Sequence, residues 1–293
     1  MKYTKLISST CLLASISALH GQISLTDAGY TQDFNATGTF SLSYGTGSHT
    51  WTDNSTIPGW YAATDSPNNG NYRASNGRGQ SPTSVTPNSS LFAFRTGTGI
   101  DGNDGALGSI ADGTHHAVIG VQFTNNTASA INGLDISYTG EQWAWNSSSD
   151  LNSLNFAYST DATSLSTGVW TDVSLLNFTA LYSGGSGEAL NGNSDEIFEN
   201  GTGYVAKTAG QAGGPGATNF TNIGSTLTGL SIAPGETFWF RWTDNFNDEG
   251  FSGVGQGIAI DNFSVGVIPE FSSVALSLGG VALALCFLRR RTR

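Results

Sequence analysis

Apolar residues recur at every second position in six segments of this chain, and turn-forming residues separate the segments. The segments are Ser90–Arg95, His116–Phe123, Leu134–Trp143, Leu154–Ser159, Thr237–Thr243 and Gly257–Val267. Such alternation turns one face of a β-strand toward a core and the other toward solvent. Long runs of Leu, Ala, Glu and Lys, which favour helices, are absent from the sequence. The pattern therefore predicts an all-β protein built as a single jelly-roll-like β-sandwich.

The C-terminal segment has a different character and is predicted to cross a membrane. Phe271–Leu288 contains no charged residue. As a helix, these 18 residues would be about 27 Å long, close to the roughly 30 Å of a bilayer's hydrocarbon core. Arg289, Arg290, Arg291 and Arg293 follow, and such basic clusters stay on the cytoplasmic side. We expect one transmembrane helix over residues 271–288 with a basic tail.

Residues 268–293 resemble the PEP-CTERM sorting signal of bacteria that make extracellular polysaccharide. That signal combines a Pro-Glu-Pro motif, a hydrophobic helix and a terminal arginine cluster, and an exosortase processes it. Pro269 and Glu270 match the motif, whereas Phe271 stands in the place of its second proline. The resemblance implies an exosortase-type partner, and either anchoring in the cytoplasmic membrane or sorting to the cell surface.

The N-terminus is typical of a secretory signal peptide. Lys2 and Lys5 form a short positive region before a mostly apolar stretch, Leu6–Leu19. This stretch is too short and too rich in serine for a stable membrane span. We predict cleavage after Gly21. The expected organisation is a signal peptide over residues 1–21, a β-sandwich domain over 22–267 and a sorting signal over 268–293.

The predicted domain is strongly acidic. All of the chain's 22 acidic residues except Glu270 lie in residues 22–267. The cations of this part are Arg73, Arg78, Arg95, Lys207 and Arg241. Such a surface repels nucleic-acid phosphates, so no nucleic-acid partner is expected, whereas divalent cations and neutral glycans are compatible with it. Both cysteines, Cys11 and Cys286, lie outside this part, so the domain has no disulfide to stabilise it.

Several segments together resemble an uncharacterised secreted β-sandwich module of bacteria. They are Ala106–Ile110, Phe123–Thr127, Ile136–Trp143, Phe238–Asp244 and Gly257–Val265. In that module an arginine usually follows the Gly-Glu-Gln-Trp string, where Ala144 stands here, and the loop between Asp244 and Gly257 is usually shorter. The resemblance implies a fold and a location outside the cytoplasm, but no activity.

Two loops carry the oxygen ligands that calcium prefers. They are Asp101–Gly105 and Asp244–Gly250, and Asp261 interrupts an apolar strand, where a carboxylate needs a partner. We therefore predict a calcium site at Asp244, Asp248 and Asp261. Asp and Asn also stabilise turns by accepting hydrogen bonds from their own backbone, so turn formation is the alternative for both loops.

Tryptophan and carboxylate side chains give the remaining functional signals. Trp143 and Trp145 stand two residues apart on one strand face and are predicted to contact a glycan, with core packing as the alternative. Glu141 would be the first candidate for a glycosidase carboxylate, with a surface carboxylate beside core aromatics as the alternative. His115 and His116 are adjacent, so on a strand they point to opposite faces.

These observations favour an exported, non-enzymatic structural or adhesive module in a polysaccharide-rich envelope. A carbohydrate-binding module, with extracellular polysaccharide as its partner, is the alternative, and a glycan hydrolase comes third. The sequence contains no HExxH or GxSxG motif.

Overall fold

The computed structural model describes residues 22–35, 40, 48–65, 69–77, 90–96, 104–112, 116–199, 202–246 and 254–269. In this part the protein is a β-sandwich whose other regular element is one short 3₁₀ turn, η1 (Ser174–Leu176). The all-β sandwich prediction is therefore confirmed. The predicted signal peptide, residues 1–21, and the predicted transmembrane helix, residues 271–288, lie outside the described residues. Within the described ranges, no helix is long and apolar enough to cross a membrane.

A seven-stranded sheet forms one layer, in the order β1-β8-β17-β10-β11, with β4 beside β8 and β12 beside β10. Its strands are β1 (Ile23–Leu25), β4 (Trp60–Thr64), β8 (Ala117–Asn125), β10 (Ser153–Ser159), β11 (Thr171–Asp172), β12 (Phe178–Thr179) and β17 (Thr237–Asn245). Three of the alternating sequence segments become β8, β10 and β17. In the ladder Phe156 lies opposite Trp242, and Trp242 lies opposite Ile119, so the large apolar residues share the inward face.

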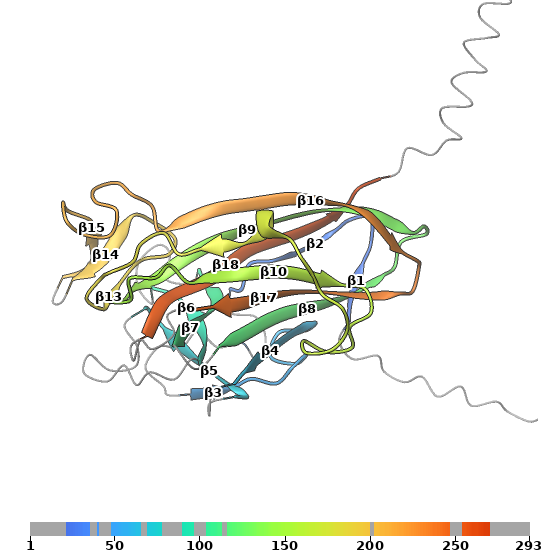
Figure 1. The fold of residues 1–293 in the computed structure, drawn as a ribbon, viewed down its shortest axis with the longest axis horizontal. Helices are drawn as coiled ribbons and strands as arrows, with labels where there is room; N and C mark the ends of the chain where they lie inside the picture. The colour runs from blue at the N-terminus through green and yellow to red at the C-terminus, as the bar shows by residue number, and fades with distance from the viewer. Residues whose placement is uncertain are drawn as a thin grey trace, which may run out of the picture.

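A nine-stranded sheet forms the other layer, in the order β13-β9-β18-β7-β6-β5-β3, with β16 beside β9 and β2 beside β18. Its strands are β2 (Tyr30–Gln32), β3 (Ser48–Thr50), β5 (Asn71–Ser75), β6 (Ser90–Phe94), β7 (Ala106–Asp112), β9 (Ile131–Trp145), β13 (Glu188–Ala189), β16 (Phe220–Ile232) and β18 (Val254–Val267). A separate hairpin pairs β14 (Glu196–Glu199) with β15 (Gly203–Ala206). In Figure 1, β16, β9, β18 and β2 lie in one layer and β10, β17 and β8 in the other, with the hairpin at one end.

Aromatic side chains from both sheets fill the space between the layers. Trp60 on β4 stacks on Trp242 on β17 with ring centroids 5.9 Å apart. Trp242 meets Phe263 on β18 edge to face at 5.4 Å. All three rings are buried. Large buried rings each remove 150–250 Å² from water as a typical figure, so this core stabilises a domain that has no disulfide.

A β-bulge in β18 determines where the acidic residues of that strand point. The register between β18 and β9 shifts between Asp261 and Ser264. Asn262 at this shift has a positive φ of 49°, a conformation that asparagine adopts more readily than most residues. Before the bulge Ile260 faces the core, and after it Phe263 does. The extra residue therefore leaves Asp261 outside the core between the sheets.

Candidate functional site

The outer face of the seven-stranded sheet carries partly exposed aromatic and polar side chains around a buried tryptophan. On β17, Trp239 and Arg241 alternate with inward-facing phenylalanines and so point outward. Tyr61 on β4 packs on Trp239 with ring centroids 4.5 Å apart. Trp170 packs against the same cluster, and Gln122 lies beside Tyr61. We call Tyr61, Gln122, Trp170, Trp239 and Arg241 the aromatic platform.

A turn-rich loop, residues 160–170, folds over the sheet and places Trp170. The Oδ1 atom of Asp161 accepts hydrogen bonds from the Ser159 hydroxyl and the Val169 amide, both 2.8 Å long. These bonds close the loop on itself. Leu165 packs on Gly120 of β8, where a Cβ would collide with its Cδ2. Glycine at position 120 therefore lets the loop approach the sheet.

Specific polar contacts hold the platform in one arrangement. The Arg241 guanidinium lies over the Trp170 ring, with Cζ 4.0 Å from the ring centroid, and its Nη1 donates to the Leu165 carbonyl at 2.8 Å. Trp170 Nε1 donates to the Thr167 carbonyl at 2.8 Å. The Tyr61 hydroxyl donates to Gln122 Oε1 at 3.1 Å. The partly exposed rings are thus already ordered, with guanidinium and amide groups beside them.

A second feature is a pair of buried carboxyl groups on the outer face of the nine-stranded sheet. Glu141 on β9 pairs with Ala259, and Asp261 pairs with Thr139, so the two acids are diagonal neighbours on adjacent strands. They are 1% and 0% exposed. Glu141 Oε2 accepts a 2.8 Å hydrogen bond from Trp143 Nε1. Asp261 Oδ2 accepts one of 2.7 Å from Asn262 Nδ2, while Asp261 Oδ1 is buried without a partner.

Burial and nearby negative charges raise the pKa of both carboxyl groups. Burial raises the pKa of Glu141 well above its usual range, and the charge of Asp261 raises it further. Burial raises the pKa of Asp261 to about 8, with Asp104 and Asp33 adding to the rise. When two carboxyl groups share a buried site, ionising both has a large cost in electrostatic free energy.

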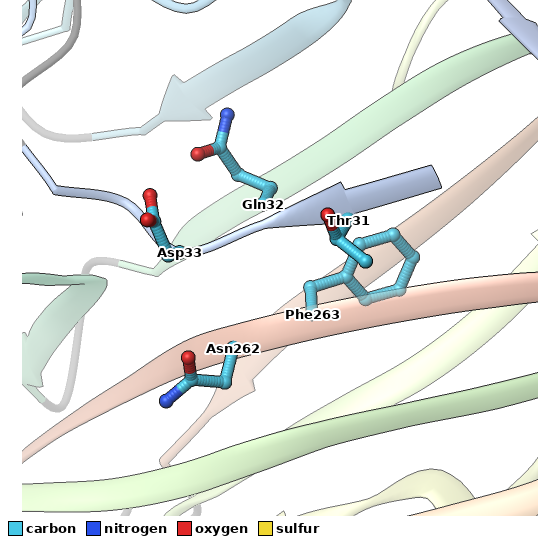
Figure 2. A pocket seen from close by; sticks show the side chains of 5 residues that line it. All are labelled: Thr31, Gln32, Asp33, Asn262 and Phe263. Carbon is cyan, nitrogen blue, oxygen red and sulfur yellow. The ribbon is translucent and has the colours of Figure 1, made fainter. Parts of the chain in front are cut away.

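Asp33 also lines a pocket of about 440 Å³, together with Thr31, Gln32, Phe263 and Asn262, the residue that follows Asp261. Figure 2 shows these five side chains, three from β2 and its end and two from the bulged part of β18.

The structure places the predicted calcium ligands in separate networks. Asp244 lies on β17 and is fully buried. It accepts hydrogen bonds from the Ser109 hydroxyl at 2.5 Å and from Asn152 Nδ2 at 3.0 Å. Burial raises the pKa of Asp244 to about 6. Asp261 belongs to the carboxyl pair described above, and Asp248 lies outside the described residues. Among the residues that the structure describes, no three His, Asp or Glu side chains are arranged to hold a metal ion.

The two predicted glycan-contact residues are held by the protein itself. Trp143 is 0% exposed and stacks on Phe94 with ring centroids 5.7 Å apart. Trp145 is partly buried and donates from Nε1 to the Ser183 carbonyl at 2.9 Å. Trp143 has no ring face open to a sugar, so the core-packing alternative describes it. Of the predicted sorting signal, Pro269 is exposed. Glu270, Arg289, Arg290 and Arg291 lie outside the described residues.

Sequence reasoning missed Tyr61, Gln122, Trp170 and Arg241 as a group. The alternation in Thr237–Thr243 could have placed Trp239 and Arg241 on one outward face. Nothing in the sequence brings Trp170 there, because its position depends on how residues 160–170 fold over a distant strand.

No protein-family model and no curated protein matches this chain. Solved structures that it resembles include the enzymatically active domain of bacteriophage CBA120 tailspike protein 4, at 7% identity and a TM-score of 0.33. That match covers 72% of this chain and only 19% of the tailspike chain. The family 11 carbohydrate-binding module of a Clostridium thermocellum cellulosomal cellulase matches at 11% identity and a TM-score of 0.30, over 77% of this chain and 98% of the module. The K1 cleaved adhesin domain of Lys-gingipain from Porphyromonas gingivalis W83 matches at 11% identity and a TM-score of 0.29, over 82% and 99% of the two chains. At TM-scores below 0.5, these likenesses assign neither a family nor a function.

Proposed function

We propose that this chain is a non-enzymatic glycan-binding β-sandwich, exported and displayed outside the cytoplasmic membrane by its C-terminal segment. The aromatic platform on the outer face of the seven-stranded sheet carries the proposal. Tyr61 and Trp170 are partly exposed aromatic residues, and aromatic rings of this kind can pack against the apolar face of a sugar. Gln122 and Arg241 place amide and guanidinium groups beside the rings, where they can bond to hydroxyl groups.

The side chains of the aromatic platform are already held in place, which favours ligand binding without rearrangement of these side chains. Trp170, Tyr61 and Arg241 are each already held by a hydrogen bond. A side chain that is fixed before binding loses little conformational entropy when the ligand arrives. The chain's net charge of −11 disfavours polyanions and is compatible with a neutral polysaccharide.

The burial of the carboxyl pair supports the non-enzymatic part of the proposal. A glycosidase needs two carboxyl groups that reach the scissile bond. Glu141 and Asp261 are 1% and 0% exposed, so neither reaches a substrate in this arrangement. Export and processing by an exosortase-type enzyme rest on the N-terminal and C-terminal sequence features, and the adhesive role follows from holding a polysaccharide at the surface.

Titration of the purified chain with neutral oligosaccharides tests the proposal. We expect Trp170→Ala and Tyr61→Ala each to weaken binding roughly tenfold or more, which corresponds to about 1.4 kcal/mol. Tyr204→Ala is the matched control, because Tyr204 is a partly exposed aromatic residue on the separate β14–β15 hairpin, and it should leave the affinity unchanged. Equal losses in all three variants, or no binding across a panel of neutral glycans, would contradict glycan binding by the platform.

A further inference from the structure

Strand β16 is a long open edge. Within the part of the chain that the structure describes, β16 hydrogen-bonds to β9 on one side only. It is 13 residues long. The other described strands that pair on one side only have two to five residues, and they are β1, β2, β3, β4, β11, β12, β13, β14 and β15. Figure 1 shows β16 running along the margin of the sandwich.

This edge lacks the features that usually prevent strand pairing between molecules. Natural edge strands are commonly kept short or interrupted by lysine, other charges, proline or a bulge. Residues 220–232 contain neither a charged residue nor a proline. The register with β9 is continuous from Phe220 to Thr228, and the single irregularity lies between Thr228 and Ile232. Alternate residues of this nine-residue run therefore point their backbone N–H and C=O groups away from β9, in a row that no bulge interrupts.

Exposed apolar side chains flank the same edge. Leu175 is 75% exposed on η1, which lies against β16. Val169 is 73% exposed and lines a pocket of about 360 Å³ together with Gly229 and Leu230 of β16. Leu175 and Val169 are two of the three large exposed apolar side chains among the described residues. Apolar side chains beside an open edge add to the free energy gained when another chain covers it.

We infer that the β16 edge pairs with the β16 edge of a second copy of this chain, over residues 220–228. Two identical strands related by a two-fold axis run antiparallel, so such pairing closes as a dimer and does not propagate along the edge. The charge distribution favours a second copy at this place. The chain has a net charge of −11, which opposes self-association in general, whereas residues 220–232 carry no charge and so add no repulsion when two copies of β16 meet. Asp135 is the exposed acid on β9 opposite this stretch, and the Thr226 hydroxyl donates to its Oδ1 at 2.5 Å.

Disulfide cross-linking of the full chain locates the interface. In a chain with Cys11 and Cys286 replaced by serine, we introduce Asn222→Cys, Gly224→Cys or Thr226→Cys separately. Residues close to a two-fold axis meet their own copies, so mild oxidation should link at least one of these variants into a dimer. Thr50→Cys is the matched control, since it is an exposed residue on β3 at the other end of the same sheet, and it should stay monomeric. Equal cross-linking at Thr50, or none on β16, would overturn the inference.

Sedimentation of the full chain in density-matched detergent measures the association. The double variant Asn222→Lys with Thr228→Lys should weaken self-association at least tenfold, because four added positive charges then lie on two adjacent strands, with the lysine at position 222 of one copy diagonal to the lysine at position 228 of the other. The double variant Asn222→Asp with Thr228→Asp should do the same. Mixing the two double variants should restore dimers, which shows that both chains are folded. An unmodified chain that sediments as a monomer at every concentration, or variants that associate as the unmodified chain does, would overturn the inference.

Discussion

The Arg241 guanidinium lies over the Trp170 ring, with Cζ 4.0 Å from the ring centroid, and its Nη1 donates to the Leu165 carbonyl. One side chain of β17 thereby contacts both the middle and the C-terminal end of the loop that crosses the outer face of the seven-stranded sheet. The aromatic platform depends on this contact, because Trp170 lies at the end of that loop and has no strand of its own to hold it.

Arg241→Lys tests this connection. Lysine keeps the charge but loses the planar group that stacks on Trp170. We expect a loss of about 1 kcal/mol in the free energy of unfolding, the usual size of a partly exposed cation–π contact, measured by urea denaturation. Glycan affinity should fall as well. A variant with unchanged stability and unchanged affinity would show that the stacking has no role in either.

Substitutions of Trp143 test whether this residue contributes to core stability or to glycan binding. Removing a fully buried tryptophan costs roughly 3–5 kcal/mol of stability, and this variant also removes the donor to Glu141. Trp143→Phe should cost less, because it retains a ring against Phe94. Measured by titration calorimetry on protein that is still folded, the glycan affinity of Trp143→Phe should equal that of the unmodified chain. A large loss of affinity would mean that Trp143 contributes to the glycan site.

Asp261→Asn should change how stability depends on pH. The pKa of Asp261 is raised from its ordinary 3.8 to about 8 in the folded protein. Below about pH 4 the carboxyl is protonated in both states, and as the pH rises the unfolded chain ionises first. The folded state therefore loses stability progressively from about pH 4 up to pH 8. Asparagine resembles the protonated acid, so the melting temperature of Asp261→Asn should match the unmodified chain near pH 4 and exceed it at pH 8. Parallel melting curves over this range would contradict the raised pKa.

Calcium binding at Asp261 stays a prediction and needs its own measurement. Burial is the main cause of the raised pKa values of the carboxyl pair. A cation bound beside the pair would stabilise the ionised carboxylates, so calcium should raise the melting temperature most at pH 8. For a ligand that binds only the folded state, a hundredfold excess over Kd adds about 2.7 kcal/mol. Asp261→Ala should abolish the calcium-dependent increase in melting temperature. Asp244→Asn should leave this increase unchanged if Asp244 only accepts hydrogen bonds from Ser109 and Asn152. Equal melting temperatures with calcium and with chelator would rule the site out.

Deletion of Phe271–Arg293 tests the sorting proposal. The uncharged stretch and the terminal arginines are the sequence features that indicate a membrane anchor. The shortened chain should be exported and recovered in the soluble fraction, whereas the full chain should fractionate with membranes. Lysine in place of Arg289, Arg290 and Arg291 is the control that keeps the charge. A shortened chain that still fractionates with membranes would place the anchor elsewhere.

The period-two alternation by itself determined the fold class and most of the long strands. The segments His116–Phe123, Leu154–Ser159 and Thr237–Thr243 fall within β8, β10 and β17, because each needs one apolar face and its own residues supply it. The same reasoning identified Asp261 as an acid that interrupts an apolar strand. Both results depend only on neighbours along the chain, which the sequence shows directly.

Tertiary structure alone decided which side chains meet. Trp143 and Trp145 are two residues apart, which predicts that they share one strand face and could contact a glycan together. In the folded protein, residues distant in sequence, Phe94 among them, cover Trp143. Asp244 and Asp261 are separated because β17 and β18 belong to different sheets, and Asp261 acquires Glu141 as its neighbour through strand pairing and the bulge at Asn262. The platform of Tyr61, Trp170 and Arg241 joins three segments that no local pattern links. Strand periodicity is a local property of the chain, whereas these contacts depend on sheet order, register and loop path, which the packing of the whole domain determines.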